Sequence, residues 1–196
     1  MTIPQDRQQA YEALCAHTHT QSLIKHALSV EAAMRAMARH FGEDEEAWGI
    51  AGLLHDLDYE QFPEEHCQHT PQMLRELGYG EDFIRAILSH GYGLCTDVEP
   101  QTNLEKSLYA VDELTGLITA CVLVRPSKSI LDLTLKSVRK KWKDKAFAAG
   151  CNRSVILDGA QRLGMDWDTL CTLVMEGMKA AAKELDLVGN LEGAVQ

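Results

Sequence analysis

Apolar residues recur every three or four positions along most of this 196-residue chain. The clearest run is Leu23, Ala27, Val30, Met34, Met37 and Phe41. This spacing places side chains on one face of an α-helix, whereas a half-buried strand would need strict alternation. We find no such alternation, no internal repeat and no low-complexity tract. The pattern therefore predicts an all-α protein.

Turn and capping residues divide the chain into expected helices. Ser22, Ser127 and Asn152 are predicted N-caps, because short oxygen-bearing side chains accept hydrogen bonds from a helix's first turn. Gly42 is predicted to end one helix. The expected helices cover residues 6–15, 22–41, 43–57, 64–77, 81–90, 103–124, 127–142, 153–163 and 167–187.

Composition excludes several classes of protein. The net charge of −10 argues against a general nucleic-acid binder. No apolar run approaches the ~18 residues of a membrane span, and residues 1–12 lack the apolar core of a secretory signal. The six cysteines form no C-x-x-C motif, which fits reduced thiols in the cytoplasm better than a disulfide framework.

Positive charge is concentrated in residues 125–145, which hold eight cations and two acids. This segment is either a solvated helix face, a platform for an anion, or a contact in a homodimer. Arg125 and Lys128 are the candidates for contacting a substrate phosphate.

An apolar run from Ile50 to Leu54 is followed directly by His55 and Asp56. Both side chains need a partner if they are buried. A divalent cation would pair with both, since imidazole and carboxylate are common metal ligands. A simple hydrogen-bonded pair is the alternative.

Further potential ligands occur one per expected helix or helix end. They are His26, His66 or His69, His90 and Asp112. Helical proteins build metal sites in this way, from side chains on facing helices.

At these positions the sequence resembles the HD superfamily of metal-dependent phosphohydrolases. The matching stretches are Ile24-Lys25-His26, Gly52-Leu53-Leu54-His55-Asp56, Glu65-His66 with Leu74-Arg75-Glu76-Leu77-Gly78, Ile87-Leu88-Ser89-His90 and Val111-Asp112-Glu113-Leu114. The resemblance covers about residues 20–120, and the tail is similar to a small bacterial subgroup of the superfamily. It implies an HD-type helical bundle in residues 1–124 and a C-terminal helical extension, residues 125–196, packed on it as one structural domain.

The resemblance also implies the site. His26, His55, Asp56 and Asp112 would hold one metal ion, and His66 and His90 would complete a second, with Asp56 bridging. His66 is preferred to His69 because its spacing to Leu74 fits the family. His55, Asp56 and Asp58 form the expected catalytic group, in which Asp58 either orients a ligand histidine or is only a turn residue.

The implied activity is hydrolysis of a small phosphorylated metabolite or nucleotide by a metal-activated water. One or two ions of Mn, Fe, Mg, Zn or Ni would serve, and no membrane or nucleic-acid polymer is expected as a partner. Many family members carry Gly-Lys after the His-Asp pair, where this chain has Asp58 and Tyr59. Two alternatives are a di-iron oxygenase and a non-catalytic metal-binding regulatory module.

Overall fold

The computed structural model describes residue 4 and residues 6–191. Its α-helices are α1 Arg7–His17, α2 Gln21–Phe41, α3 Glu45–Leu54, α4 Thr70–Glu76, α5 Glu81–Leu88, α6 Asn103–Leu123, α7 Leu135–Trp142, α8 Arg153–Arg162 and α9 Trp167–Ala180. Two short 3₁₀ turns, η1 Pro63–Glu65 and η2 Ser89–Gly91, complete the set. Within the described part of the chain the only β pairing is an isolated bridge between Tyr92 and Thr96. The all-α prediction is confirmed.

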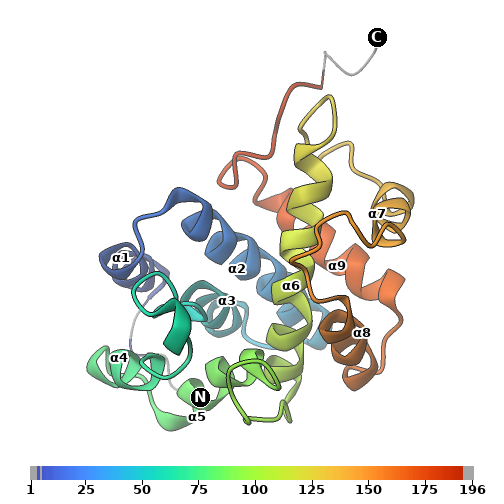
Figure 1. Ribbon diagram of the computed structural model, residues 1–196. Coiled ribbons are helices and arrows are strands. Elements are labelled where there is room, and N and C mark those ends of the chain that lie inside the picture. The colour runs from blue at the N-terminus through green and yellow to red at the C-terminus, as the bar shows by residue number, and fades with distance from the viewer. Residues whose placement is uncertain (1–3, 5, 192–196) are drawn as a thin grey trace.

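Two long helices, α2 and α6, form the centre of the molecule (Figure 1). α2 packs against α3, α9 and α6, and α6 packs in turn against α8 and α9. Met34, Ile50, Leu108 and Leu114 are fully buried between these helices. The apolar period read from the sequence thus corresponds to the faces that make the core.

Glycines bring the backbones of neighbouring helices unusually close to α2. A Cβ atom at Gly52 of α3 would lie 2.9 Å from the carbonyl oxygen of Val30. A Cβ at Gly177 of α9 would lie 2.4 Å from the carbonyl oxygen of Ala32. Any larger residue at either position would push two helices apart. The α2–α3 approach matters most, since it sets the distance between His26 and the residues that follow α3.

The helix expected over residues 64–77 is wrong in its first half. Only Thr70–Glu76 is α-helical, and residues 66–69 form an irregular turn after η1. Pro71 lies in the first turn of α4, where its missing N–H removes no helical hydrogen bond. His66 therefore lies in a loop and not in the first turn of a helix.

Two predicted N-caps are also wrong. α2 begins after Thr20, and the Glu60 carboxylate accepts hydrogen bonds from the N–H groups of His19 and Thr20. α7 begins after Thr134, because the Ser127 hydroxyl bonds instead to the carboxylate of Asp132. In the first case a carboxylate distant in the sequence holds the two residues that precede the helix, and no side-chain hydrogen bond caps the first turn of α2.

The C-terminal segment contributes directly to the core. Ile156 of α8 and Leu170 and Met178 of α9 have no exposed surface. α8 packs on α6 and α9 packs on α2, which are helices of the N-terminal part (Figure 1). Among the described residues, no helix combines the length and apolar character required to cross a membrane.

Candidate metal centre

His55 follows the last residue of α3 and is completely buried. Its Nδ1 lies 2.8 Å from the carbonyl oxygen of Gly52, and since a carbonyl can only accept, Nδ1 carries the proton. Nε2 is buried and makes no hydrogen bond, although oxygens of Asp56 and Asp112 lie 3.3 and 3.4 Å away. The Nε2 atom of His55 therefore points toward two carboxylates, between which either a proton on Nε2 or a bound cation would balance the negative charge. This arrangement fits a cation between them.

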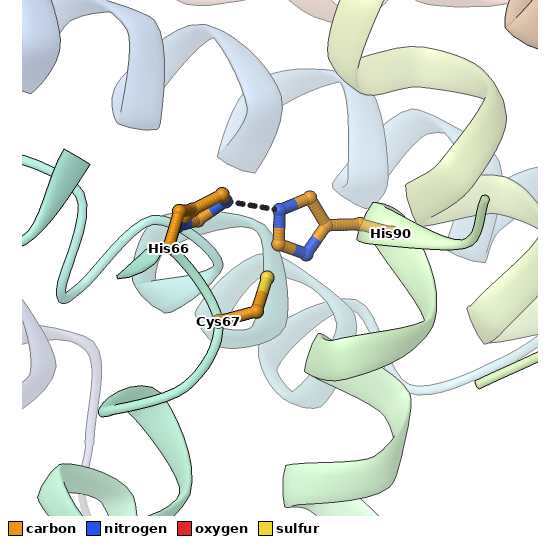
Figure 2. A group of neighbouring side chains, drawn as sticks. All are labelled: His66, Cys67 and His90. Carbon is orange, nitrogen blue, oxygen red and sulfur yellow. Dashed lines mark hydrogen bonds between the residues drawn. The ribbon is translucent and has the colours of Figure 1, made fainter. Parts of the chain in front are cut away.

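His66 and His90 face each other across the same site (Figure 2). Nδ1 of His66 donates to the Asp58 carboxylate at 2.8 Å, and Nδ1 of His90 donates to the carbonyl of Ile87 at 2.6 Å. The two Nε2 atoms are 3.1 Å apart. With both Nδ1 atoms protonated, two lone pairs would oppose each other at this distance. A shared cation or proton is needed to relieve their repulsion.

Asp56 joins the two groups of histidines. Its Oδ1 lies 3.3 Å from Nε2 of His66 and 3.5 Å from Nε2 of His90. Its Oδ2 lies 3.3 Å from Nε2 of His55 and 3.7 Å from Nε2 of His26, which itself lies 2.9 Å from Asp112. One carboxylate thus offers one oxygen to each group, as a bridging ligand would.

The electrostatics of the cluster favour positive charge at its centre. Burial opposes the charged form of His55, yet the carboxylates of Asp56 and Asp112 raise its pKa well above the ordinary value. Burial alone would raise the pKa of Asp56, but His55 and His90 hold that pKa well below its usual range. The pKa of Asp112 is lowered in the same way, by His55 and His26 against burial. Both carboxylates are therefore ionised, and histidines or metal ions must balance them.

The cluster lies in a cavity of about 600 Å³. His26, Asp56, His66, His90 and Asp112 line it, whereas His55 lies buried behind them. None of the described residues that line the cavity is a lysine or an arginine. An anionic substrate in this cavity would therefore depend on bound cations for charge balance.

The chain's similarity to known proteins agrees with this geometry. Residues 23–117 match the model of the HD domain family, described as "HD domain". The chain contains an HD domain. The matched region holds His26, His55, Asp56, His66, His90 and Asp112. HD domains belong to a superfamily of metal-dependent phosphohydrolases, and the donor set described above suits a divalent metal ion.

The HD domain also has curated relatives. A protein named Ribonuclease Y from Nitratidesulfovibrio vulgaris strain DP4 is 31% identical over 100 residues, and Ribonuclease Y from Oleidesulfovibrio alaskensis is 29% identical over 100 residues. The match covers 50% of this chain but only 18% of each relative's length. No solved structure gives a significant match to the chain.

Asp58 does not line the cavity of the HD domain, so its carboxylate would not contact a substrate bound there. It is fully buried, and besides His66 it accepts hydrogen bonds from the backbone N–H groups of His69 and Thr70. These contacts outweigh its burial and lower its pKa. Of the two roles predicted for Asp58 within the expected catalytic group, orientation of a ligand histidine fits these contacts, because its carboxylate holds the ring of His66. His69 itself points away, bonds to Glu65 at 2.5 Å and stacks on Phe62.

The two predicted phosphate-binding cations are not brought to the HD-domain cavity. Neither Arg125 nor Lys128 lines it. The guanidinium of Arg125 is engaged by the Asp132 carboxylate at 2.9 Å, beyond the end of α6. The basic helix α7 likewise lines a different surface depression, through Lys136, Arg139 and Lys140. The predicted substrate contact of Arg125 and Lys128 is therefore wrong for this cavity.

Sequence reasoning missed one wall of the cavity. Ala148, Gly150 and Cys151, from the segment before α8, line it together with Glu113 of α6. The Glu113 carboxylate accepts a hydrogen bond from the backbone N–H of Asn152 at 3.0 Å and so ties this segment to α6. The only sequence signal was that Glu113 directly follows a predicted ligand.

Proposed function

We propose that this protein is a metal-dependent phosphohydrolase that acts on a small phosphorylated metabolite or nucleotide. The observation that carries the proposal is the convergence of four imidazoles and two carboxylates in one cavity. The buried Nε2 of His55 has no hydrogen-bond partner, and none of the described residues that line the cavity is a lysine or an arginine. A metal ion would bind the Nε2 atom of His55, and its positive charge would replace that of a lysine or arginine in the cavity.

The residues of this chain would divide the work as follows. His26, His55 and Asp112 would hold one cation, His66 and His90 a second, and Asp56 would contact both. A divalent cation supplies Lewis acidity toward a phosphoryl oxygen and makes water a better nucleophile near neutral pH. Asp58, Gly52 and Ile87 keep the imidazoles in the tautomer that directs Nε2 inward. The protein thus contributes orientation and a preorganised charge distribution.

The rest of the cavity supports a small substrate with an apolar portion. Exposed Tyr59 and Leu94 lie on its lining beside the metal-ligand candidates. Tyr59 stands where many family members carry a lysine after the His-Asp pair, and no lysine or arginine is among the described residues that line the cavity. We therefore propose that substrate charge is balanced by the metal ions and that the apolar residues contact the non-phosphate portion.

A phosphodiester in RNA is a second candidate substrate. It is favoured by the relatives named Ribonuclease Y, although the match covers only 100 residues and 18% of their length. The net charge of −10 and the acidic cavity disfavour a long polyanion.

The six cysteines are free thiols, which supports our proposal of a reducing compartment such as the cytoplasm.

The test combines metal analysis with a substrate panel. Protein purified without oxygen is analysed for metal content, then assayed for phosphate release from mononucleotides and sugar phosphates, and for cleavage of a single-stranded RNA oligonucleotide, in Mn²⁺ and in Mg²⁺. We expect one to two metal ions per chain and release of phosphate from a small substrate. Cleavage of the oligonucleotide alone would favour the RNA candidate. Iron with oxygen consumption would indicate an oxygenase, and metal without turnover would indicate a regulatory module.

A further inference from the structure

Two cysteines lie beside the second group of histidines. Cys67 directly follows His66 and is buried, with 3% of its surface exposed. Its Sγ and one ring nitrogen from each of His66 and His90 all lie within 4.8 Å of one another. Figure 2 shows the sulfur of Cys67 turned toward the two rings. Cys95, which lines the cavity, places its Sγ 3.0 Å from that of Cys67.

The local backbone is arranged to place these sulfurs. Cys67 has a φ of 71°, a left-handed conformation that is uncommon for a residue with a side chain. Cys95 lies in a tight turn in which the carbonyl of Gly91 accepts hydrogen bonds from the N–H groups of Leu94 and Cys95. A Cβ atom at Gly91 would lie 2.2 Å from the sulfur of Cys95. Only glycine at this position leaves room for the thiol.

We propose that Cys67 is a metal ligand at the second position, in a set with His66, His90 and the Asp56 carboxylate. Cys95 would donate a hydrogen bond to the Cys67 sulfur. This inference rests on the proposed function, which supplies the metal ion. It adds that Cys67 is one of the ligands, and the ligand type determines which metal ion the second position prefers.

The distances suit such a set. Ligand atoms around one tetrahedral zinc ion lie roughly 3–4 Å apart, given bond lengths of about 2.0–2.3 Å. The two Nε2 atoms are 3.1 Å apart and the ligand atoms of Cys67 and the two histidines all lie within 4.8 Å of one another, so movements of about 1 Å would bring them to these separations. With Asp56 the set offers four ligand atoms, which is the usual number for zinc in proteins.

The chemistry of sulfur separates the two metal positions. His26, His55 and Asp112 offer only nitrogen and oxygen, which suit Mn²⁺ or Fe²⁺ as well as Zn²⁺. A thiolate at the second position would favour Zn²⁺, or Co²⁺ in its place, over Mg²⁺ and Mn²⁺. We therefore expect the second position to be selective for zinc.

Cobalt substitution tests the ligand directly. The metal-free protein is loaded with Co²⁺, bound cobalt is measured by elemental analysis, and the near-ultraviolet spectrum is recorded. A cysteine ligand gives an intense sulfur-to-cobalt charge-transfer band, which imidazole and carboxylate ligands do not. We expect this band in the unmodified protein and in Cys95→Ser and Cys15→Ser, and its loss in Cys67→Ser. Zinc affinity at the second position should fall at least tenfold in Cys67→Ser, while manganese affinity should change little.

The outcomes separate this inference from the proposed function. Bound cobalt without a charge-transfer band in the unmodified protein would overturn the role of Cys67 and leave the metal centre intact. A band that survives Cys67→Ser but disappears in Cys95→Ser would also overturn it. Absence of any bound cobalt would overturn both proposals. The unmodified protein gives the first answer, so the test does not depend on the folding of a variant.

Discussion

At the scale of single residues, the centre depends on which histidine nitrogen carries the proton. Carbonyl oxygens of Gly52 and Ile87 impose this choice on His55 and His90, and they can do so at any pH because they cannot donate. His66 differs, because its Nδ1 partner is the Asp58 carboxylate. The orientation of His66 therefore depends on a side chain that mutation can change.

Replacement of Asp58 by asparagine tests this dependence. An amide offers one acceptor and one donor, so it allows His66 to carry its proton on Nε2 and to lose its ligand lone pair. Changes to such supporting partners typically cost about 10–100-fold in metal affinity. We expect a loss of this size at the second position only, measured by metal titration. Glu60→Gln is the control, because Glu60 bonds to the start of α2 and not to a histidine ring; equal affinities for both variants would contradict the assignment.

Asp56 gives a second prediction at this scale. Its two oxygens face different pairs of histidines, so Asp56→Ala should abolish binding at both positions. Asp112→Ala should remove only the ion held with His26 and His55, because Asp112 contacts that pair alone. Elemental analysis after equilibration with Mn²⁺ distinguishes the two results. Full metal content in Asp56→Ala would show that Asp56 is not a ligand.

At the scale of helices, the close approach of α2 and α3 brings the ligands together. His26 belongs to α2, whereas His55 and Asp56 follow α3. Gly52 lies one turn before Asp56, at the point where the two backbones nearly touch. The separation of these helices therefore determines the separation of the ligands.

Gly52→Ala should damage both stability and metal binding. The added methyl group would meet backbone atoms of Val30 and Glu31 at 2.9 Å, which cannot rotate away as a side chain would. We expect a loss of about 1–3 kcal/mol in the free energy of unfolding, as for other overpacked cores. Gly116→Ala in α6 is the matched control, since nothing lies within 4 Å of its added Cβ, and it should gain roughly 0.5–1 kcal/mol. Chemical denaturation measures both; an unchanged Gly52→Ala variant would show that α2 and α3 separate easily.

At the scale of the whole molecule, residues 125–191 are part of the same packed unit as the HD domain. α9 covers α2, α8 covers α6, and the segment before α8 forms one wall of the cavity. Without them, Ala36 of α2, which Gly177 approaches, and Ala110 of α6, which Gly159 approaches, would lose neighbours. The HD domain of this chain therefore packs against a segment outside the 23–117 match.

A fragment of residues 1–124 should consequently fail to fold cooperatively. Circular dichroism would show reduced helix content and a broad thermal transition, in contrast to the full chain. A sharp transition and metal binding by the fragment would instead show that residues 125–196 form a dispensable extension.

Metal binding should stabilise the full chain as a unit. An ion at a hundred times its Kd contributes about 2.7 kcal/mol, which corresponds to a rise in Tm of roughly 5–11 °C for a chain of this size. Addition of a chelator should reverse the rise, and Asp56→Ala should not show it. Differential scanning calorimetry in Mn²⁺ and in Zn²⁺ makes this comparison.

The sequence alone determined the helical class, the positions of most helices and the residue types suited to a metal centre. These features depend on interactions within a few residues, such as the period of the apolar face in α2 and the cap that Asn152 provides to α8. Such local rules operate wherever a helix begins, ends or buries one side.

Only the tertiary structure decided which polar residues meet. It placed His66 in the cluster and His69 outside it, against Glu65. It also paired the Asp58 carboxylate with the ring of His66, and the Arg125 guanidinium with the Asp132 carboxylate. It also brought Cys95 to Cys67 across 28 positions of sequence. These pairings arise in irregular loops, where no periodicity exists to read, and they depend on how closely distant helices pack.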